Sequence, residues 1–292
     1  MKKSVTPMLV LVALVVAAIA AIGNSTTQTL PFSQDWSNPA LITTNNDWSA
    51  VPGINGYLGE VTLTNTTGVD PQTLLADIGD GVPDVFANQT NASSFTSGGP
   101  AEFDALSDPT VAMQGSGSAD APHLILYINS LTKQNLNLSY NLRDIDCGAT
   151  AGIIQQFVAQ YRIGGVGAWT NIAGSYVANA SDGLASTCTK VTPVSVALPP
   201  ACDNVAEVQI RIMTTNAVSS DEEIAVDDIS VTGEDIPPPP TGACCQSSSC
   251  SVTTAADCAQ LGGSYLGDNT DCAGCATGAA KRSWGKLQTT YR

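Results

Sequence analysis

Basic residues are scarce in this chain of 292 residues. It carries 11 Lys and Arg against 26 Asp and Glu, a net charge of −15 at pH 7. Six of the basic residues lie at the two ends, in 2–3 and 281–292, so the long segment between them holds five basic residues against all the acidic ones. Binding nucleic acid through charge needs a basic patch. The composition therefore excludes nucleic acid as a partner.

Histidine occurs once, as His123, which excludes every mechanism that needs two histidines. His123 has the same strand parity as Ile125 and Tyr127, so it is predicted to be a packed residue rather than a catalytic base. The chain also lacks a Gly-x-Ser-x-Gly elbow, a phosphate loop and a His-Glu-x-x-His motif. We therefore expect that the protein is not an enzyme.

Aromatic residues make up only 5% of the chain. Exposed rings would serve as stacking platforms for sugars. The candidates outside the clear strands are Trp36, Trp48, Trp169, Tyr57 and Tyr176. With so few rings, most are needed inside the fold, and Trp169, which follows a Gly-rich turn, is expected to pack on a hairpin.

Long apolar runs are absent after the first 23 residues. Lys2 and Lys3 precede an apolar run of 15 residues, Met8 to Ile22, and small-x-small motifs end at Ala20 and at Gly23. This pattern predicts a secretory signal peptide at 1–23. The alternative is an uncleaved anchor, but the run is shorter than the roughly 20 residues that a span needs. We expect a secreted or cell-surface protein with no membrane span after cleavage.

Four consecutive prolines, 237–240, mark a stiff linker. They predict a β-sandwich domain at 28–235, a proline linker at 236–241 and a cysteine-rich module at 242–276. A basic and aromatic tail follows at 277–292.

The 28–235 segment is typical of strands rather than helices. Apolar residues alternate with polar ones in four runs, and a fifth run is apolar throughout; the runs are 124–128, 136–142, 157–163, 194–198 and 208–212. This pattern predicts an all-β, two-sheet antiparallel sandwich of jelly-roll type. Within Ile224–Val231 the alternation slips at Asp227 and Asp228, which predicts a β-bulge. Only Asp70–Ala76 is expected to form a short helical turn.

Nine cysteines divide into a cluster and three isolated residues. The cluster holds six, namely Cys244, Cys245, Cys250, Cys258, Cys272 and Cys275. So small a segment cannot bury a core, and an exported protein can form disulfides, so we expect three crosslinks whose pairing stays open among fifteen. The alternative is zinc, but adjacent Cys244 and Cys245 are poor chelators. In the sandwich, Cys147 and Cys188 fall at one end and are predicted to pair, leaving Cys202 free.

Several stretches resemble a β-sandwich domain of uncharacterised role in secreted bacterial proteins. They are Phe32–Trp36, Asn46–Ser49, Ala87–Thr90, Leu142–Asp146, Gln160–Gly164 and Ile212–Asn216. Ile224–Val231 is also similar to the last strand of MAM-like and carbohydrate-binding jelly rolls. Gly242–Cys245 and the cysteines after it resemble a short GACC-type cysteine-rich module. These resemblances imply the sandwich fold and no particular activity.

The resemblance to those jelly rolls implies a structural Ca²⁺ held by Asp228 and Asp227 on the last strand, near Asp35. The alternative is a bulge whose aspartates bond to loop amides. A second group of acids is expected at one end of the sandwich, and it comprises Asp144, Asp146, Asp221, Glu222 and Glu223. Clustered carboxylates suit calcium, and the alternative is a solvated acidic loop.

Together these features predict an exported, non-enzymatic binding or adhesion module. Its expected partner is an extracellular glycan or a surface protein. The alternative is a structural subunit of a coat, matrix or appendage that assembles with itself, since low charge, many Asn, Ser and Thr residues and crosslinks also suit that role.

Overall fold

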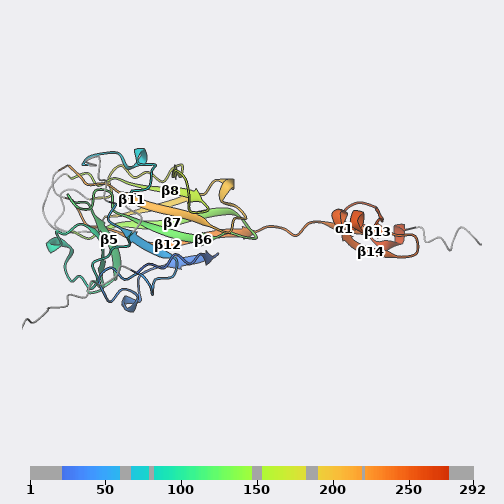
Figure 1. The fold of residues 1–292 in the computed structure, drawn as a ribbon, viewed down its shortest axis with the longest axis horizontal. Helices are drawn as coiled ribbons and strands as arrows, with labels where there is room; N and C mark the ends of the chain where they lie inside the picture. Colours follow the sequence, from blue (N-terminus) through green and yellow to red (C-terminus); the bar gives the residue numbers. More distant parts are fainter. Residues whose placement is uncertain are drawn as a thin grey trace, which may run out of the picture. The chain divides into compact units, whose positions relative to one another are not determined.

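The computed structural model describes residues 22–59, 67–78, 82–146, 153–181, 190–218 and 221–275. The chain divides into two compact units, Met1–Asp235 and Ile236–Arg292. The first unit is built from strands and the second is a small module containing one short helix (Figure 1). The predicted leader, apart from its last two residues, and the predicted tail lie outside the described residues.

The first sheet has six strands, in the order β9-β8-β11-β6, with β1 and β3 sharing the far edge of β6. All its pairs are antiparallel except β1 with β6. The strands are β1 (Gln28–Thr29), β3 (Ile54–Tyr57), β6 (His123–Asn129), β8 (Phe157–Ile163), β9 (Thr170–Asn171) and β11 (Val208–Thr214).

The second sheet also has six strands, in the order β10-β7-β12-β5-β4, and β2 pairs with β12 as well. Its pairs are all antiparallel. The strands are β2 (Phe32–Gln34), β4 (Gly99–Phe103), β5 (Thr110–Gln114), β7 (Lys133–Asp144), β10 (Val191–Ala197) and β12 (Ile224–Asp235).

Alternation along the strands creates the core between the two sheets. In β7 the even-numbered residues 136–144 are buried and the odd-numbered residues 137–143 are half-buried, as the sequence pattern predicts. Buried residues of both sheets, from Leu124 and Ile210 to Leu138 and Val226, form one apolar cluster. The predicted all-β, two-sheet antiparallel sandwich of jelly-roll type is confirmed, as are the five predicted strand runs.

The predicted bulge in β12 is also confirmed. The register between β12 and β7 shifts between Asp227 and Ser230, and Asp228 has a φ of 50°. Before the bulge β12 pairs with β5, and after it β12 pairs with β2. The extra residue therefore lets one edge of β12 serve two different neighbours.

In the described residues of the sandwich unit, the helical structure consists of short 3₁₀ turns. They are η1 (Pro39–Leu41), η2 (Pro71–Thr73), η3 (Ala92–Ser94) and η4 (Pro200–Cys202), and η2 lies in the predicted 70–76 turn. Asp70 begins η2 by accepting a bond from the Gln72 amide at 2.9 Å. No helix in the described part of the chain has the length and hydropathy to cross a bilayer.

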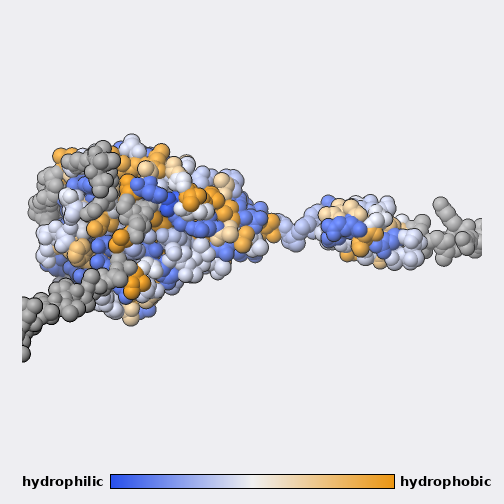
Figure 2. All heavy atoms as spheres, in the orientation of Figure 1, coloured by the Kyte–Doolittle hydropathy of each residue, from blue (hydrophilic) through white to orange (hydrophobic). Residues whose placement is uncertain are grey.

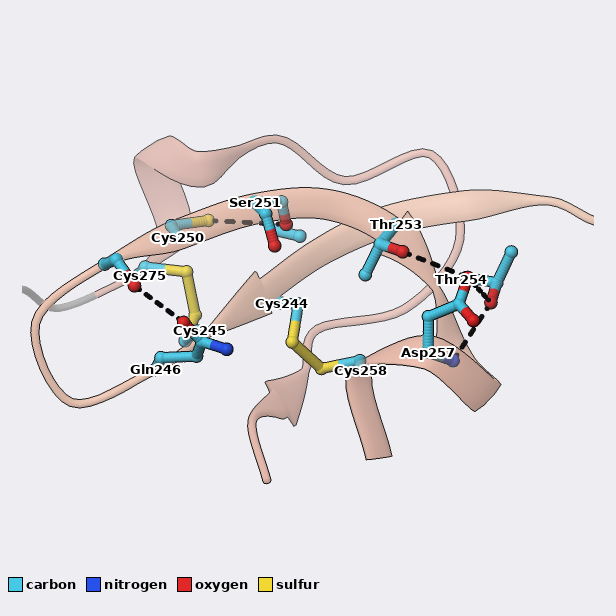
Figure 3. Close-up of a disulfide and its surroundings, with 12 residues drawn as sticks. Cys244, Cys245, Gln246, Cys250, Ser251, Thr253, Thr254, Asp257, Cys258 and Cys275 are labelled. Atoms are coloured by element: carbon cyan, nitrogen blue, oxygen red, sulfur yellow. Dashed lines mark hydrogen bonds between the residues drawn. A yellow bond between two sulfur atoms is a disulfide. The ribbon is translucent and has the colours of Figure 1, made fainter. Parts of the chain in front are cut away.

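The cysteine module has a three-stranded sheet, β14-β13-β15, and one helix. Its elements are β13 (Thr241–Cys245), β14 (Cys250–Thr254), α1 (Ala255–Gln260), β15 (Ser264–Tyr265) and η5 (Cys272–Gly274). Thr254 caps α1, because its hydroxyl oxygen accepts from the Asp257 amide at 3.1 Å (Figure 3). The same hydroxyl donates to Asp257 Oδ2 at 2.8 Å.

Three disulfides hold the module, namely Cys244–Cys258, Cys245–Cys275 and Cys250–Cys272. The first ties β13 to α1 (Figure 3). All six predicted half-cystines are thus paired, as export to an oxidising compartment would permit. Cys202 is the free, buried thiol that the sequence predicts. Cys147 and Cys188 lie outside the described residues, so their pairing stays a prediction.

Candidate functional site

Four of the five aromatic side chains proposed as sugar platforms are buried. Relative exposure is 3% for Trp36, 0% for Trp48, 1% for Trp169 and 3% for Tyr57, and Tyr176 is half-buried. The indole Nε1 of Trp36 donates to the Val226 carbonyl at 2.8 Å, inside the fold. The scarcity of aromatics explains this result, because nine of the fourteen aromatic residues in the described chain are buried. Any ligand site on this unit must therefore work without a stacked tryptophan.

The outer face of the first sheet is polar, yet it is buried. Arg211, on β11, is fully buried, and its guanidinium carbon lies 4.5 Å from the centroid of the Trp169 ring. Arg162, on β8, lies over the same ring at 4.2 Å. Gln160 accepts from Arg211 Nε at 2.9 Å. Such a set of donors would suit a ligand if it were open to solvent.

Residues 71–77 of the same chain fill that face. Arg211 donates to the Leu74 carbonyl at 2.6 Å and to the Ala76 carbonyl at 3.1 Å. The Trp169 amide donates to the Leu75 carbonyl at 2.8 Å, and its indole donates to Asp77 at 3.1 Å. Asp77 also forms an ion pair with Arg162. The donors of this face are therefore occupied from within the molecule.

Part of the second sheet is covered too, over β4 and β5. Phe95 and Phe103 pack there with Ala112 and Ala225 in a small apolar cluster, and half-buried Phe86 lies against it. Phe86, Phe95 and the polar residues of 89–97 line a shallow cavity of about 190 Å³. In the view of Figure 2, hydrophobic residues of the unit are scattered among hydrophilic ones.

The other half of the second sheet carries a row of serines on its outer face. The strand registers pair Ser33 with Ser230, Ser230 with Ser139, and Ser139 with Ser195. These four residues come from β2, β12, β7 and β10, and directly paired residues point to the same side of a sheet. Ser33 and Ser195 are exposed, and Ser139 and Ser230 are half-buried. We call them the serine row.

Amides and hydroxyls flank the serine row on the same face. Asn137 pairs with Thr232 and with Ala197 on one side, and Asn141 pairs with Pro193 on the other. Asn137 and Asn141 are half-buried, whereas Thr232 and Pro193 are exposed. With strands about 4.8 Å apart, the row presents a hydroxyl at each strand over about 14 Å. No pattern in the sequence marks this surface, because the row forms only when four strands are in register.

The strand pairing brings the three aspartates proposed as calcium ligands near one another. Gln34 on β2 pairs with Ile229, which directly follows Asp227 and Asp228 on β12, and Asp35 follows Gln34. Each has a polar neighbour. Asp227 forms an ion pair with Arg143, Asp228 accepts from Asn141 Nδ2 at 2.8 Å, and Asp35 accepts from Ser37 Oγ at 2.8 Å. A calcium site at these residues stays a prediction.

The acidic residues at the ends of β7 and β12 do gather. Asp144, Glu222 and Glu223 are buried, while Asp146 and Asp221 are half-buried. Burial raises the pKa of Glu223 well above its usual value, and nearby Asp146 and Asp221 raise it further. Burial likewise raises the pKa of Asp221 to about 6. The expectation of a fully solvated loop is therefore wrong for the buried members.

His123 is fully buried, as the sequence predicts. Its Nδ1 lies 2.9 Å from the Ala121 carbonyl, and its ring stacks on Tyr57 with centroids 5.2 Å apart. These contacts make it a packed residue of the first sheet.

The sequence matches no protein-family model, and it matches no curated protein. Among solved structures, the chain is similar to the xylan-binding module CBM15, with 10% identity, a TM-score of 0.36, and coverage of 71% of this chain and 99% of that one. It is also similar to the K1 cleaved adhesin domain of Lys-gingipain from Porphyromonas gingivalis W83, with 9% identity, a TM-score of 0.38, and coverage of 70% and 98%. At these scores the likenesses assign no function to this chain.

Proposed function

We propose that the chain is an exported, non-catalytic binding module whose serine row contacts an extracellular glycan. The observation that carries this proposal is the open, hydroxyl-rich face over β10, β7, β12 and β2. The first sheet's outer face is filled by residues 71–77 and the β4–β5 region is covered by an apolar cluster. Ser33 and Ser195 are exposed, so the serine row is a part of the sandwich that is open to a ligand.

The chemistry of the serine row fits a polyhydroxylated ligand. Serine hydroxyls donate and accept, and an asparagine amide does both as well. Asn137 and Asn141 flank the row and add amide groups to its hydroxyls, although Asn141 Nδ2 already donates to Asp228 and Ser195 Oγ lies 3.4 Å from Asn137 Oδ1. Without an aromatic platform the contact consists of hydrogen bonds, which are individually weak in water. We therefore expect a low affinity for one sugar unit and gain from a long polymer that spans several strands.

The proposed function is tested most directly by placing a bulky charge at one end of the serine row, on β10. Ser195→Arg projects from exposed β10 and leaves the core untouched, because its neighbours Val194 and Val196 face inwards. We expect this variant to weaken binding on a glycan array by at least about tenfold. Thr170→Arg is the matched control, since Thr170 is exposed on β9 of the other sheet and should change nothing.

Two results would count against the proposal. If both variants bind glycan equally well, the binding site is not at the serine row. If the natural sequence shows no saturable binding, the ligand is not a glycan. Ordered polymers of the purified protein would favour the alternative, a structural subunit. Pairing of β10 edges is an unpromising route to such polymers, because Pro193 lies in this edge strand and has no amide hydrogen to donate.

A further inference from the structure

Two phenylalanines line the cavity over β4 and β5, and both are held in place by the fold. Phe95 is buried and makes edge-to-face contacts with Phe86 and Phe103, with ring centroids 5.3 Å and 6.1 Å away. Phe86 is half-buried, and its backbone bonds to β4 on both sides. Its amide donates to the Pro100 carbonyl at 3.0 Å, and its carbonyl accepts from the Glu102 amide at 2.9 Å. The aromatic part of the lining is therefore formed without a ligand.

A tight turn supplies the polar part of the lining. Asn91 begins η3, because its Oδ1 accepts from the Ser93 amide at 3.1 Å, and its carbonyl accepts from the Ser94 hydroxyl at 3.1 Å. Gln114 Nε2 donates to the Phe95 carbonyl at 3.3 Å and ties the end of the turn to β5. These bonds fix the shape of the cavity in advance, which lowers the entropic cost of binding a ligand.

The polar lining carries no charge. Among the described residues that line the cavity, those within 89–97 other than Phe95 bear amides or hydroxyls, and none is acidic or basic. The side-chain hydroxyls of Thr90, Thr96 and Ser97 are at exposed positions and make no hydrogen bond to the described chain. Each can therefore donate to a ligand and accept from it. A carboxylate or an ammonium group would lose water here without gaining a partner of opposite charge.

We propose that this cavity binds one uncharged pyranose ring. A sugar ring presents C–H groups that pack on an aromatic side chain and hydroxyls that bond to amides and other hydroxyls. The volume of about 190 Å³ lies below the roughly 300 Å³ at which pockets for drug-sized ligands begin, so a single ring is the appropriate size. The cavity lies over β4 and β5, whereas the serine row crosses β10, β7, β12 and β2. It is a second site and does not rest on the proposed function.

The test uses the full exported chain and saturation-transfer NMR with free monosaccharides, which are too short to span the serine row. The probes are glucose, galactose, mannose, xylose and N-acetylglucosamine, each added alone. We expect saturable transfer to at least one of them, with a dissociation constant on the order of 10⁻³ M because the ligand is small. Glucuronate, the charged counterpart of glucose, should receive no transfer, since no basic residue of the described chain lines the cavity.

Matched variants locate the sugar. Thr96→Trp fills the cavity from an exposed lining position and should abolish the transfer. Phe86→Leu keeps an apolar side chain but removes the ring, and it should weaken binding by about fivefold or more. Ser93→Trp is the matched control, since it adds the same bulk at an exposed position of the same turn that does not line the cavity. Ser195→Arg, at the serine row, should also bind the monosaccharide as the natural sequence does.

Three results would overturn the proposal. They are the absence of saturable transfer to every neutral sugar, an unchanged transfer in Thr96→Trp, and equally strong transfer to glucuronate. If Thr96→Trp fails to fold, Phe86→Leu decides, and an unchanged affinity there counts against the cavity. Transfer that is lost in Ser195→Arg would assign the sugar to the serine row, which overturns this site and supports the proposed function. Failure of the serine row to bind a polymer would leave the expected monosaccharide results unchanged.

Discussion

The guanidinium of Arg211 lies 4.5 Å from the centre of the Trp169 ring, and both residues are shielded from solvent. Arg211 also donates to the carbonyls of Leu74 and Ala76. Arg211 lies on the outer face of the first sheet, and residues 71–77, more than a hundred positions away in the sequence, cover it and bury its charge. The polar composition of this face serves the fold and leaves no opening for a ligand.

Replacing Arg211 by methionine tests this structural role. Met keeps an apolar chain of similar length but removes every donor, so the Ala76 carbonyl loses the Arg211 bond and the Leu74 carbonyl keeps the longer bond from Gln160 Nε2 at 3.3 Å. We expect the free energy of unfolding to fall by about 3 kcal/mol or more. Urea unfolding of the sandwich measures the change. Thr170→Ala, on the exposed edge beside Trp169, is the control, and an Arg211→Met loss below about 1 kcal/mol would contradict the assigned role.

The sandwich could be predicted from the sequence because its signal is local. Alternation with period two identified β7, β8, β10 and β11, and a slip of one residue located the bulge at Asp227 and Asp228. The filling of the first sheet's outer face could not be predicted in this way. No pattern in residues 71–77 indicates that they contact Gln160 and Arg211, because these contacts depend on the topology of the whole domain.

The candidate site shows the same division. The serine row combines residues that are up to 197 positions apart, and it becomes visible only from the registers of β2, β12, β7 and β10. Sequence reasoning did place the acidic residues of 144–146 and 221–223 at one end, since the direction of each strand suffices for that. It could not tell that Glu223 is buried without a partner, because burial of one carboxyl group depends on side-chain packing.

The N-terminus that cleavage of the predicted signal peptide would leave is a further prediction. The Ile22 amide donates to the Asn46 carbonyl at 2.9 Å, and the Trp48 amide donates to the Ile22 carbonyl at 2.7 Å. Cleavage after Gly23 would remove these bonds and leave a donor of buried Trp48 unsatisfied. We therefore expect cleavage after Ala20, which retains Ile22, although the span assigned from sequence ends at Gly23. N-terminal sequencing of exported protein decides, and a chain that begins at Asn24 would refute this expectation.

Stability should depend on pH through Glu102. Burial raises its pKa from 4.5 to about 7, against the opposing effect of the Asn88 amide, which donates to Oε2 at 2.8 Å. Between these two values the native state holds a proton that the unfolded chain has lost. The contribution of Glu102 to stability is therefore greatest below about pH 4.5 and falls as the pH rises to about 7.

Glu102→Gln should flatten that part of the pH profile, because glutamine keeps an oxygen for the Asn88 amide and carries no charge. Thermal unfolding at several pH values in EGTA measures the slope without calcium. Glu234→Gln, at an exposed carboxylate, is the control and should leave the slope unchanged. A slope that survives in Glu102→Gln would assign the dependence to other buried carboxyl groups, such as Asp221 and Glu223, whose pKa values burial also raises.

The disulfides of the module differ in what they contribute. Cys244–Cys258 closes a separation of 14 residues and Cys250–Cys272 one of 22, so loop entropy alone ranks the second bond as the more stabilising. Burial ranks them the other way. Cys244 and Cys258 are fully buried and, with Ala243, make up the apolar interior of the module, whereas Cys250 and Cys272 are half-buried.

We expect the buried pair to dominate, because its sulfurs replace the core that so short a segment cannot otherwise build. Replacing Cys244 and Cys258 by alanine should unfold the module at ambient temperature, a loss in the range of about 2–5 kcal/mol. The matched Cys250→Ala and Cys272→Ala pair should leave it folded but less stable. Limited proteolysis of the full chain measures how fast the module is cleaved while the sandwich stays intact. The reverse order would show that loop entropy, rather than the packing of the buried sulfurs, determines how this module is held together.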